Sequence, residues 1–185
     1  MKKEDLKTIN DINLVNDALT GNMAAFEAIV SKYEPMVAKI IIPMLGNSYD
    51  ADDIGQETFI RFYKSMEKFK GESQLSTYLA RIAINLSLNE IKKRTKQRTL
   101  SSDDEYNYNM PNGDTDESKD ITDMVNSSLK VLDPKFRSVI VLRYIQGFST
   151  RETAGILSLP EGTVLSRLSR GQIKLKEIIT KLNRI

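Results

Sequence analysis

The spacing of apolar residues along the chain is that of helices almost throughout. Apolar positions recur every three or four residues, and the period-two alternation typical of strands is nearly absent. Capping and turn residues divide the pattern into segments. We expect helices over about residues 12–19, 23–34, 35–46, 50–68, 76–96, 123–132, 134–147 and 149–158, and a last one from 160. The pattern predicts an all-α protein.

Local signals indicate where several of these helices begin. Pro35 is expected to start a new helix, and Pro43 to bend or shorten it before Gly46, because proline lacks the backbone N–H that a helix interior uses. Asp50 is expected to cap the helix that follows it. Asp133-Pro134 has the chemistry of a cap followed by the first helical position.

Residues 149–170, STRETAGILSLPEGTVLSRLSR, indicate two short helices joined by a tight turn. Ser149 and Glu152 have the spacing of a capping box. In the second helix Val164 and Leu168 are four residues apart and can pack inward, and the opposite side carries Glu161, Gly162, Leu165, Ser166 and Arg170. This pattern favours a helix-turn-helix whose second helix enters a DNA major groove. A plain helical hairpin with a polar outer face is the alternative.

The amino-acid composition excludes most classes of catalytic and metal site. The chain has no Cys and no His, which excludes thiol nucleophiles, disulfides and thiolate or imidazole metal ligands. A carboxylate-only site stays open, but Asp52 and Asp53 are adjacent and diverge on a helix. We therefore expect no enzyme, no metal, no cofactor and no small-molecule substrate. The polar N-terminus and the lack of an apolar run of ~20 residues predict a soluble cytoplasmic protein.

Charge is unevenly distributed along the chain. Residues 1–97 carry 14 basic and 13 acidic side chains, residues 98–122 carry 2 and 7, and residues 123–185 carry 11 and 5. The middle segment is polar, with turn formers at 111–113, and predicts a flexible acidic linker between two separately folded domains, 1–97 and 123–185. The basic last third indicates a polyanionic partner.

The helix expected after Ser76 carries one polar strip. At about 100° per residue, a strip roughly 80° wide contains no acid and holds Tyr78, Arg81, Asn85, Asn89, Lys92 and Lys96. Basic side chains suit phosphates, amides suit base edges, and a tyrosine face suits an unstacked base. An ordinary solvated strip would more often mix acids with bases.

Two long stretches resemble one known family. Residues 132–175, LDPKFRSVIVLRYIQGFSTRETAGILSLPEGTVLSRLSRGQIKL, resemble the promoter-reading domain four of bacterial sigma factors. Residues 50–94, DADDIGQETFIRFYKSMEKFKGESQLSTYLARIAINLSLNEIKKR, resemble sigma domain two. More narrowly, the chain resembles the extracytoplasmic-function (ECF) class, which has only these two domains.

The resemblance implies a promoter-specificity subunit of RNA polymerase. It places docking on the polymerase β′ clamp at Asp52, Asp53, Gln56 and Glu57. It assigns recognition and melting of the −10 element to domain 1–97, through Lys70, Ser73, Tyr78, Arg81, Asn85, Asn89, Lys92 and Lys93. It assigns the −35 element to domain 123–185, through Glu161, Gly162, Thr163, Leu165, Ser166, Arg167 and Arg170.

The resemblance also implies other partners and leaves rival functions open. Members of the class contact the polymerase β flap as well as promoter DNA, and an anti-sigma protein usually holds them inactive. Asn89 stands where many members have Asp, and Leu165 stands where Lys or Arg is usual, which affects the −35 sequence that is read. The rivals are a stand-alone helix-turn-helix regulator of duplex DNA and an all-helical adaptor that binds only protein.

Overall fold

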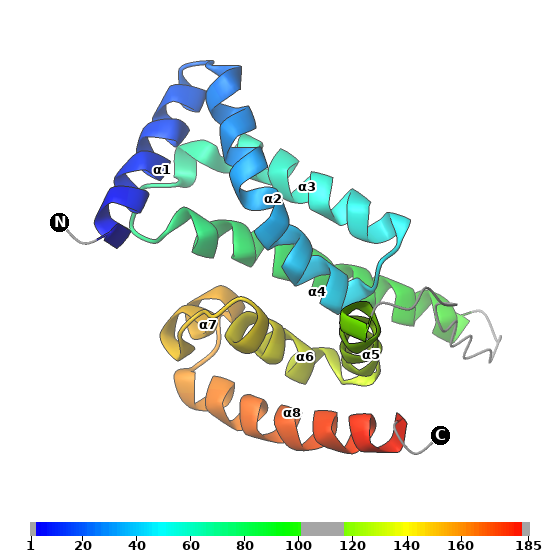
Figure 1. Cartoon of the computed structure of the whole chain (residues 1–185). Helices are drawn as coiled ribbons and strands as arrows, with labels where there is room; N and C mark the ends of the chain where they lie inside the picture. Colours follow the sequence, from blue (N-terminus) through cyan, green and yellow to red (C-terminus); the bar gives the residue numbers. More distant parts are fainter. Residues whose placement is uncertain (1–2, 101–116, 183–185) are drawn as a thin grey trace.

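The structure is a computed structural model that describes residues 3–100 and 117–182, and within those ranges all regular structure is helical (Figure 1). The prediction of an all-α protein is confirmed. The N-terminal half, residues 3–100, contains α1 (Lys3–Leu19), α2 (Met23–Leu45), α3 (Tyr49–Ser65), the 3₁₀ turn η1 (Met66–Lys68) and α4 (Leu75–Leu100). The C-terminal half, residues 117–182, contains α5 (Glu117–Val131), α6 (Pro134–Ile140), the π-helical turn η2 (Val141–Ile145), α7 (Thr150–Leu157) and α8 (Glu161–Leu182).

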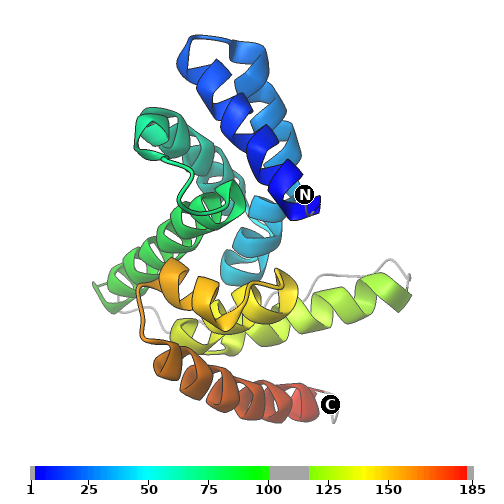
Figure 2. The ribbon, with the colours of Figure 1, turned by 90° about the vertical axis from the view of Figure 1, so that its left-hand side faces the viewer.

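Helix α2 is the centre of the N-terminal half. It packs against α1, α3 and α4, and the four helices lie together at the top of the molecule (Figures 1 and 2). Its fully buried side chains include Ile29, Ile40 and Met44, which meet Phe62 of α3 and Leu79 of α4 in one apolar cluster. This cluster fixes α4, whose exposed side carries most of the predicted −10 residues.

The expected helix boundary at Pro35 is wrong. Both Pro35 and Pro43 lie inside α2, which continues to Leu45. The buried residues explain this, because Ile29, Tyr33 and Val37 keep a four-residue spacing straight through the proline. Burying that stripe outweighs the roughly 3 kcal/mol that proline costs in a helix interior.

The expected cap at Asp50 is also wrong. Helix α3 begins at Tyr49, with Ser48 in the capping position and no side-chain cap hydrogen bond. Asp50 accepts from the Arg94 guanidinium of α4 at 2.5 Å instead. An acidic side chain in the first turn still complements the helix dipole, so Asp50 favours the helix start without capping it.

The C-terminal half begins as its local signals predict. Asp133 caps α6 by accepting from the backbone N–H of Lys135 at 2.9 Å, and Pro134 occupies the first turn. Burial alone would raise the pKa of Asp133, but the hydrogen bonds from Lys135 and the nearby cations outweigh it and lower that pKa. A second apolar cluster, which includes Leu129, Phe136, Val164 and Leu168, holds α5, α6, α7 and α8 together.

The structure has the two helical halves that the sequence predicts, and these halves also pack against each other. Contacts join α2 to α5 and η2, and α4 to α7 (Figure 2). Val141, Leu142, Phe148 and Ile156 of the C-terminal half belong to the same buried cluster as the N-terminal core. Of the predicted linker, residues 98–100 end α4 and 117–122 begin α5, while 101–116 lie outside the described residues.

Arg137 connects the halves from a buried position. Its guanidinium donates to the carbonyls of Lys130 and Leu132 in its own half and to that of Met44 in the last turn of α2. Burial lowers the pKa of Arg137 to about 10, which still leaves the side chain charged at neutral pH. The cation therefore stabilises the carbonyl end of α2.

Gly46, which ends α2, should not tolerate a side chain. Its backbone has φ 88° and ψ 169°, and an added Cβ would lie 2.2 Å from Lys130 Cε. We expect Gly46→Ala to lower the free energy of unfolding by about 1–3 kcal/mol, because this backbone region is essentially restricted to glycine. Urea denaturation followed by circular dichroism measures it. The matched control is Gly55→Ala inside α3, where an added Cβ meets nothing within 4 Å and should be neutral or stabilising.

Candidate nucleic-acid interfaces

The turn between α7 and α8 has the local structure of a helix-turn-helix. The Ser149 backbone N–H donates to the Glu152 carboxylate at 2.7 Å, and the Glu152 N–H donates to Ser149 Oγ at 3.2 Å, which confirms the predicted capping box. Ser158 ends α7 in the left-handed region with φ 54°. The chain then reverses through Leu159 and Pro160 into α8.

Helix α8 packs on α6 through small and apolar residues. Val164 and Leu168 are buried, as their four-residue spacing predicts. Gly171 continues the same side, where an added Cβ would lie 3.1 Å from Ile140 Cδ1 and 3.3 Å from Phe136 Cβ. This close approach fixes the direction in which the opposite side of α8 points.

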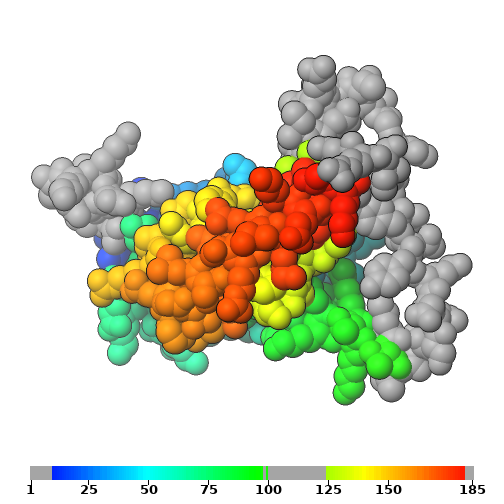
Figure 3. Space-filling view, turned by 90° about the horizontal axis from the view of Figure 1, so that it is seen from below, coloured from blue at the N-terminus to red at the C-terminus, as the bar shows by residue number. Residues whose placement is uncertain are grey.

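The outer side of α8 carries most of the predicted −35 residues. Helix α8 lies across one face of the molecule with its surface open (Figure 3). Its exposed residues include Glu161, Gly162, Leu165, Ser166 and Arg170, and Leu165 is 54% exposed. Thr163 and Arg167 are half-buried, so the structure separates these two from the other predicted −35 residues.

The strip on α4 is exposed over most of its length. Arg81, Asn85, Asn89, Lys92 and Lys96 are exposed. The buried residues of α4 lie in its first half: Leu75, Leu79, Ala80, Ala83, Ile84, Leu86 and Ser87. Lys93 is exposed as well and pairs with Glu90 at 3.6 Å. In the preceding loop Lys70 and Ser73 are also exposed. The structure thus brings most of the predicted −10 residues onto one side of the N-terminal half.

Tyr78 differs from the rest of the strip. Its ring packs edge-on against Phe62, with centroids 6.0 Å apart, and against Phe69, with centroids 5.5 Å apart. Its hydroxyl donates to Ser65 Oγ at 3.2 Å. Much of the aromatic surface that we expected to receive a base is therefore used in packing the N-terminal half.

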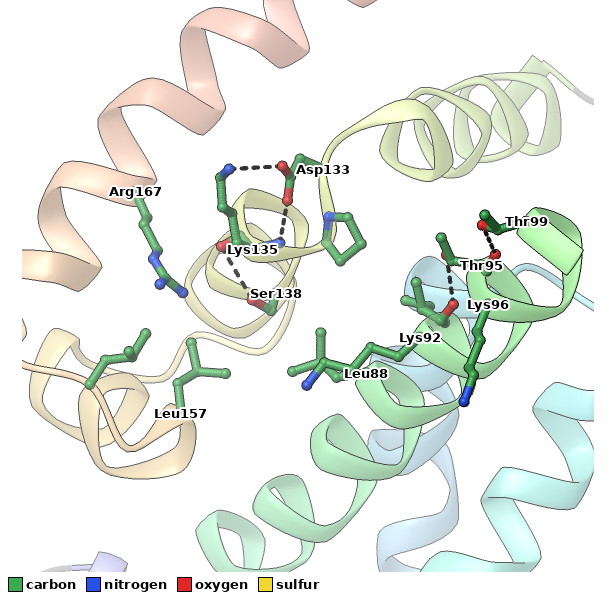
Figure 4. A pocket seen from close by; sticks show the side chains of 13 residues that line it. Leu88, Lys92, Thr95, Lys96, Thr99, Asp133, Lys135, Ser138, Leu157 and Arg167 are labelled. Atoms are coloured by element: carbon green, nitrogen blue, oxygen red, sulfur yellow. Dashed lines mark hydrogen bonds and ion pairs between the residues drawn. The ribbon is translucent and has the colours of Figure 1, made fainter.

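A cavity of about 550 Å³ lies where α4 faces the C-terminal half (Figure 4). Leu88 and Ile91 of α4 line it opposite Leu157 and Leu159, which flank the end of α7. Cationic side chains from both halves also line it: Lys92, Lys96, Lys135 and Arg167. Arg167 therefore faces α4 across this cavity instead of joining Ser166 and Arg170 on the outer side of α8.

The predicted docking residues lie on the exposed side of α3. Asp52, Asp53 and Gln56 are exposed, and their side chains have no hydrogen-bonding or ion-pair partner among the described residues. Glu57 is half-buried and accepts from Arg61 at 2.7 Å. The acidic N-terminal turn and the amide thus form one accessible surface.

This surface continues along α3 through apolar residues that the sequence reasoning missed. Tyr49, Ile60 and Tyr63 are 91%, 45% and 46% exposed. Together with Asp53 and Gln56 they recur every three or four residues, which places them on one side of the helix. This three- or four-residue spacing is the feature of the sequence from which the surface could have been predicted. Exposed apolar side chains in a row with polar ones are typical of a protein-binding surface.

Residues 3–100 and 117–182 contain neither a membrane-spanning helix nor a cluster of metal ligands. No helix there is both long and apolar enough to cross a membrane, and no three Asp or Glu side chains gather where they could hold a metal ion.

Comparison with known proteins matches each half of the chain to a Sigma-70 family. The family Sigma-70 region 2 matches residues 29–97, and the family Sigma-70 region 4 matches residues 123–175. The chain is 33% identical over 173 residues to the ECF RNA polymerase sigma factor SigW of Bacillus subtilis, covering 88% of this chain and 92% of that protein. It is 31% identical over 185 residues to the ECF RNA polymerase sigma-E factor of Haemophilus influenzae, covering 94% and 97%.

Solved structures agree in fold. CnrH, solved in complex with the cytosolic domain of CnrY, is 24% identical with a TM-score of 0.69, and the match covers 93% of this chain and 98% of that one. RpoE of Bartonella quintana, solved with the anti-sigma factor NepR, is 24% identical with a TM-score of 0.69, covering 84% and 96%.

Substitutions of Tyr78 test how much its ring and its hydroxyl contribute to the packing of the N-terminal half. We expect Tyr78→Ala to cost on the order of 3 kcal/mol in unfolding free energy, because it removes a ring from a packed aromatic cluster. Tyr78→Phe keeps the ring and should cost about 1 kcal/mol, the worth of one hydrogen bond. Denaturant unfolding of both variants measures this, and equal stabilities would show that the ring does not support the core.

Proposed function

Because the chain belongs to the ECF family of bacterial RNA polymerase sigma factors, we propose that it directs core polymerase to promoters through three surfaces. The outer side of α8 reads the −35 element, the exposed strip of α4 and the loop before it read and open the −10 element, and the exposed side of α3 docks on the polymerase β′ clamp. The observation that carries this proposal is the presence of two separate polar helix faces, one in each half of a single chain.

The proposal for α8 rests on its exposed donors. Arg170 and Ser166 lie on the side that points away from α6. An arginine can donate twice to a guanine edge in the major groove, and a serine hydroxyl can bond to several bases. Leu165 offers an apolar contact that suits a thymine methyl. Thr163 and Arg167 remain proposed contacts that would have to approach DNA from the side of α8 nearer to α4.

The proposal for α4 rests on its amides and cations. Asn85 and Asn89 project from the exposed side of a helix whose opposite side is packed in the core. Lys92 and Lys93 follow within one turn and suit phosphates. Extruding a base from the duplex costs a few kcal/mol, which hydrogen bonds from Lys70, Ser73 and the asparagines would have to offset.

Further partners follow from the family. We propose that the β flap contacts the C-terminal half, and that an anti-sigma protein binds the chain and holds it inactive. The sigma factor RpoE of Bartonella quintana was solved in complex with an anti-sigma factor, NepR. We propose a cytoplasmic location, where core polymerase acts. The relatives are sigma factors, and we propose that this chain too has no catalytic site or small-molecule substrate of its own. A stand-alone regulator would leave the α4 strip and the α3 surface unexplained.

A double substitution tests the docking surface. Asp52→Ala together with Gln56→Ala should weaken binding to core polymerase about tenfold or more, because it removes two exposed polar groups from the centre of the proposed interface. Alanine favours helix, so α3 should remain folded. Titration of the labelled chain with core polymerase measures the affinity.

The matched control removes two exposed side chains from another helix. Glu27→Ala together with Ser31→Ala has the same four-residue spacing on α2 and should leave the affinity unchanged. Parent-like binding by the Asp52/Gln56 variant, or equal weakening by the control, would contradict the docking assignment.

A second experiment separates the two DNA-reading surfaces. Arg170→Ala should weaken formation of the closed promoter complex about tenfold to a hundredfold, the worth of one good base contact. Asn85→Ala should leave closed-complex binding nearly intact and impair strand opening, since its target is exposed only in the melted strand. Promoter binding and permanganate reactivity of unpaired thymines measure the two steps with the holoenzyme.

A pre-melted −10 bubble provides the control for that experiment. The bubble should restore most of the function of Asn85→Ala, because it removes the step that the variant impairs. It should not restore Arg170→Ala. Equal rescue of both variants would show that the −35 and −10 assignments are wrong.

A further inference from the structure

The helix that carries the proposed docking residues begins without a side-chain cap. Ser48 occupies the capping position of α3 but makes no cap hydrogen bond. Its hydroxyl oxygen is buried and has no hydrogen-bond partner among the described residues. The first N–H groups of a helix lack partners within the helix. The start of α3 therefore depends on contacts other than a cap.

Apolar packing anchors the second half of α3 more firmly than the first. Thr58, Phe59 and Phe62 are buried in the second half. In the first half Ala51 is buried and Ile54 is half-buried against the same core. A small side chain buries little apolar surface, so it stabilises its position less than a phenylalanine does. The docking residues lie in this less firmly anchored half.

Arg94 of α4 contacts the uncapped start of α3. Its Nη2 donates to Asp50 Oδ2 in the first turn of α3 at 2.5 Å. Its Nε donates to Glu90 Oε1, one turn earlier on α4, at 3.2 Å. A planar guanidinium presents several donors in a fixed geometry and can hold two carboxylates at once. Arg94 therefore joins the first turn of α3 to α4.

The opposite end of α3 has its own hydrogen bond to α4. Tyr78, near the start of α4, donates to Ser65 Oγ at the end of α3 at 3.2 Å. The Arg94–Asp50 pair joins the later part of α4 to the start of α3. The two helices therefore run antiparallel, and α3 is tied to α4 near both of its ends. These two contacts orient the docking side of α3 relative to the strip on α4.

Arg94 differs from the lysines around it in the sequence. Its side chain is 29% exposed, against 65% for Lys93. Lys92 and Lys96 are exposed as well. A phosphate that approached Arg94 would have to displace two carboxylates from it, whereas the lysines can meet a phosphate directly. The surroundings of Arg94 thus favour a role inside the N-terminal half over a DNA contact.

We propose that Arg94 is a positioning residue of the docking surface, which holds the start of α3 against α4 and touches neither polymerase nor DNA. This inference rests on the proposed function of the α3 and α4 surfaces. Without Arg94 the first turns of α3 are less restrained, so Asp52, Asp53 and Gln56 are presented to polymerase in a less fixed geometry.

A double-mutant cycle tests the pair. Arg94→Gln and Asp50→Asn each remove one charge at nearly constant size, and each should weaken binding to core polymerase about twofold to fivefold, the range expected for one exposed ion pair. The double variant should bind no more weakly than either single variant, because each single change already breaks the contact.

Titration of the labelled full-length chain with core polymerase measures the four affinities. The titrations are run at a temperature at which circular dichroism shows all four chains to be folded, so a loss of stability alone does not change the affinity. Parent-like binding by Arg94→Gln would overturn the inference. Additive losses in the double variant would overturn it too, because they would mean that Asp50 and Arg94 act independently.

Salt dependence tests whether Arg94 meets a phosphate. Holoenzyme, formed at a polymerase concentration that saturates every variant, is bound to single-stranded −10 DNA from a promoter that the parent transcribes. Each phosphate contact with a single strand contributes about 0.7 to the slope of log affinity against log salt. Arg94→Gln should keep the parent slope, whereas Lys93→Gln, which removes a proposed phosphate contact, should lower it by about 0.7. An equal fall for Arg94→Gln would overturn the inference.

The two proposals fail in different ways. If Arg94→Gln binds core polymerase like the parent while the Asp52/Gln56 variant binds weakly, the positioning role is wrong and the proposed function stands. If the parent chain itself does not bind core polymerase, the proposed function fails.

Discussion

Two arginines orient the halves of the chain by donating to carbonyls at helix ends across an interface whose core is apolar. Arg137 of α6 donates to the last turn of α2, and Arg81 of α4 donates to the end of α7. The last carbonyls of a helix lack partners within it and carry the negative end of its dipole. A guanidinium therefore stabilises them both by donating hydrogen bonds and by its positive charge. The two contacts run in opposite directions across the interface, so together they fix α4 and α2 against the C-terminal half.

Features carried by neighbouring residues could be predicted from the sequence. The Ser149–Glu152 capping box and the Asp133 cap each depend on residues two or three positions apart, and both form as expected. The Pro35 boundary failed because a local penalty competed with burial along the whole of α2. The continuous four-residue spacing of Ile29, Tyr33 and Val37 already indicated one helix that passes through Pro35.

The candidate surfaces show the same difference between features that neighbouring residues determine and features that depend on distant residues. The exposure of Leu165, Ser166 and Arg170 was predictable, because Val164 and Leu168 fix the inner side of α8. The positions of Tyr78 and Arg81 were not, since their partners lie elsewhere in the chain. Tyr78 meets Phe62 and Phe69 from other elements, and Arg81 meets a carbonyl 74 positions away. Periodicity indicates which side of a helix is polar, but not what packs against it.

Separating the halves leaves no buried charge without partners. Arg137 keeps its hydrogen bonds to the Lys130 and Leu132 carbonyls, and only Nη1 has to exchange Met44 for water. Arg81 is already exposed, so its guanidinium can be hydrated at once. The main cost is apolar, because Leu142, Phe148 and Ile156 are buried in the cluster that they share with the N-terminal core. A partner that opens the chain must therefore cover apolar surface on the C-terminal half, and DNA alone is poorly suited to that.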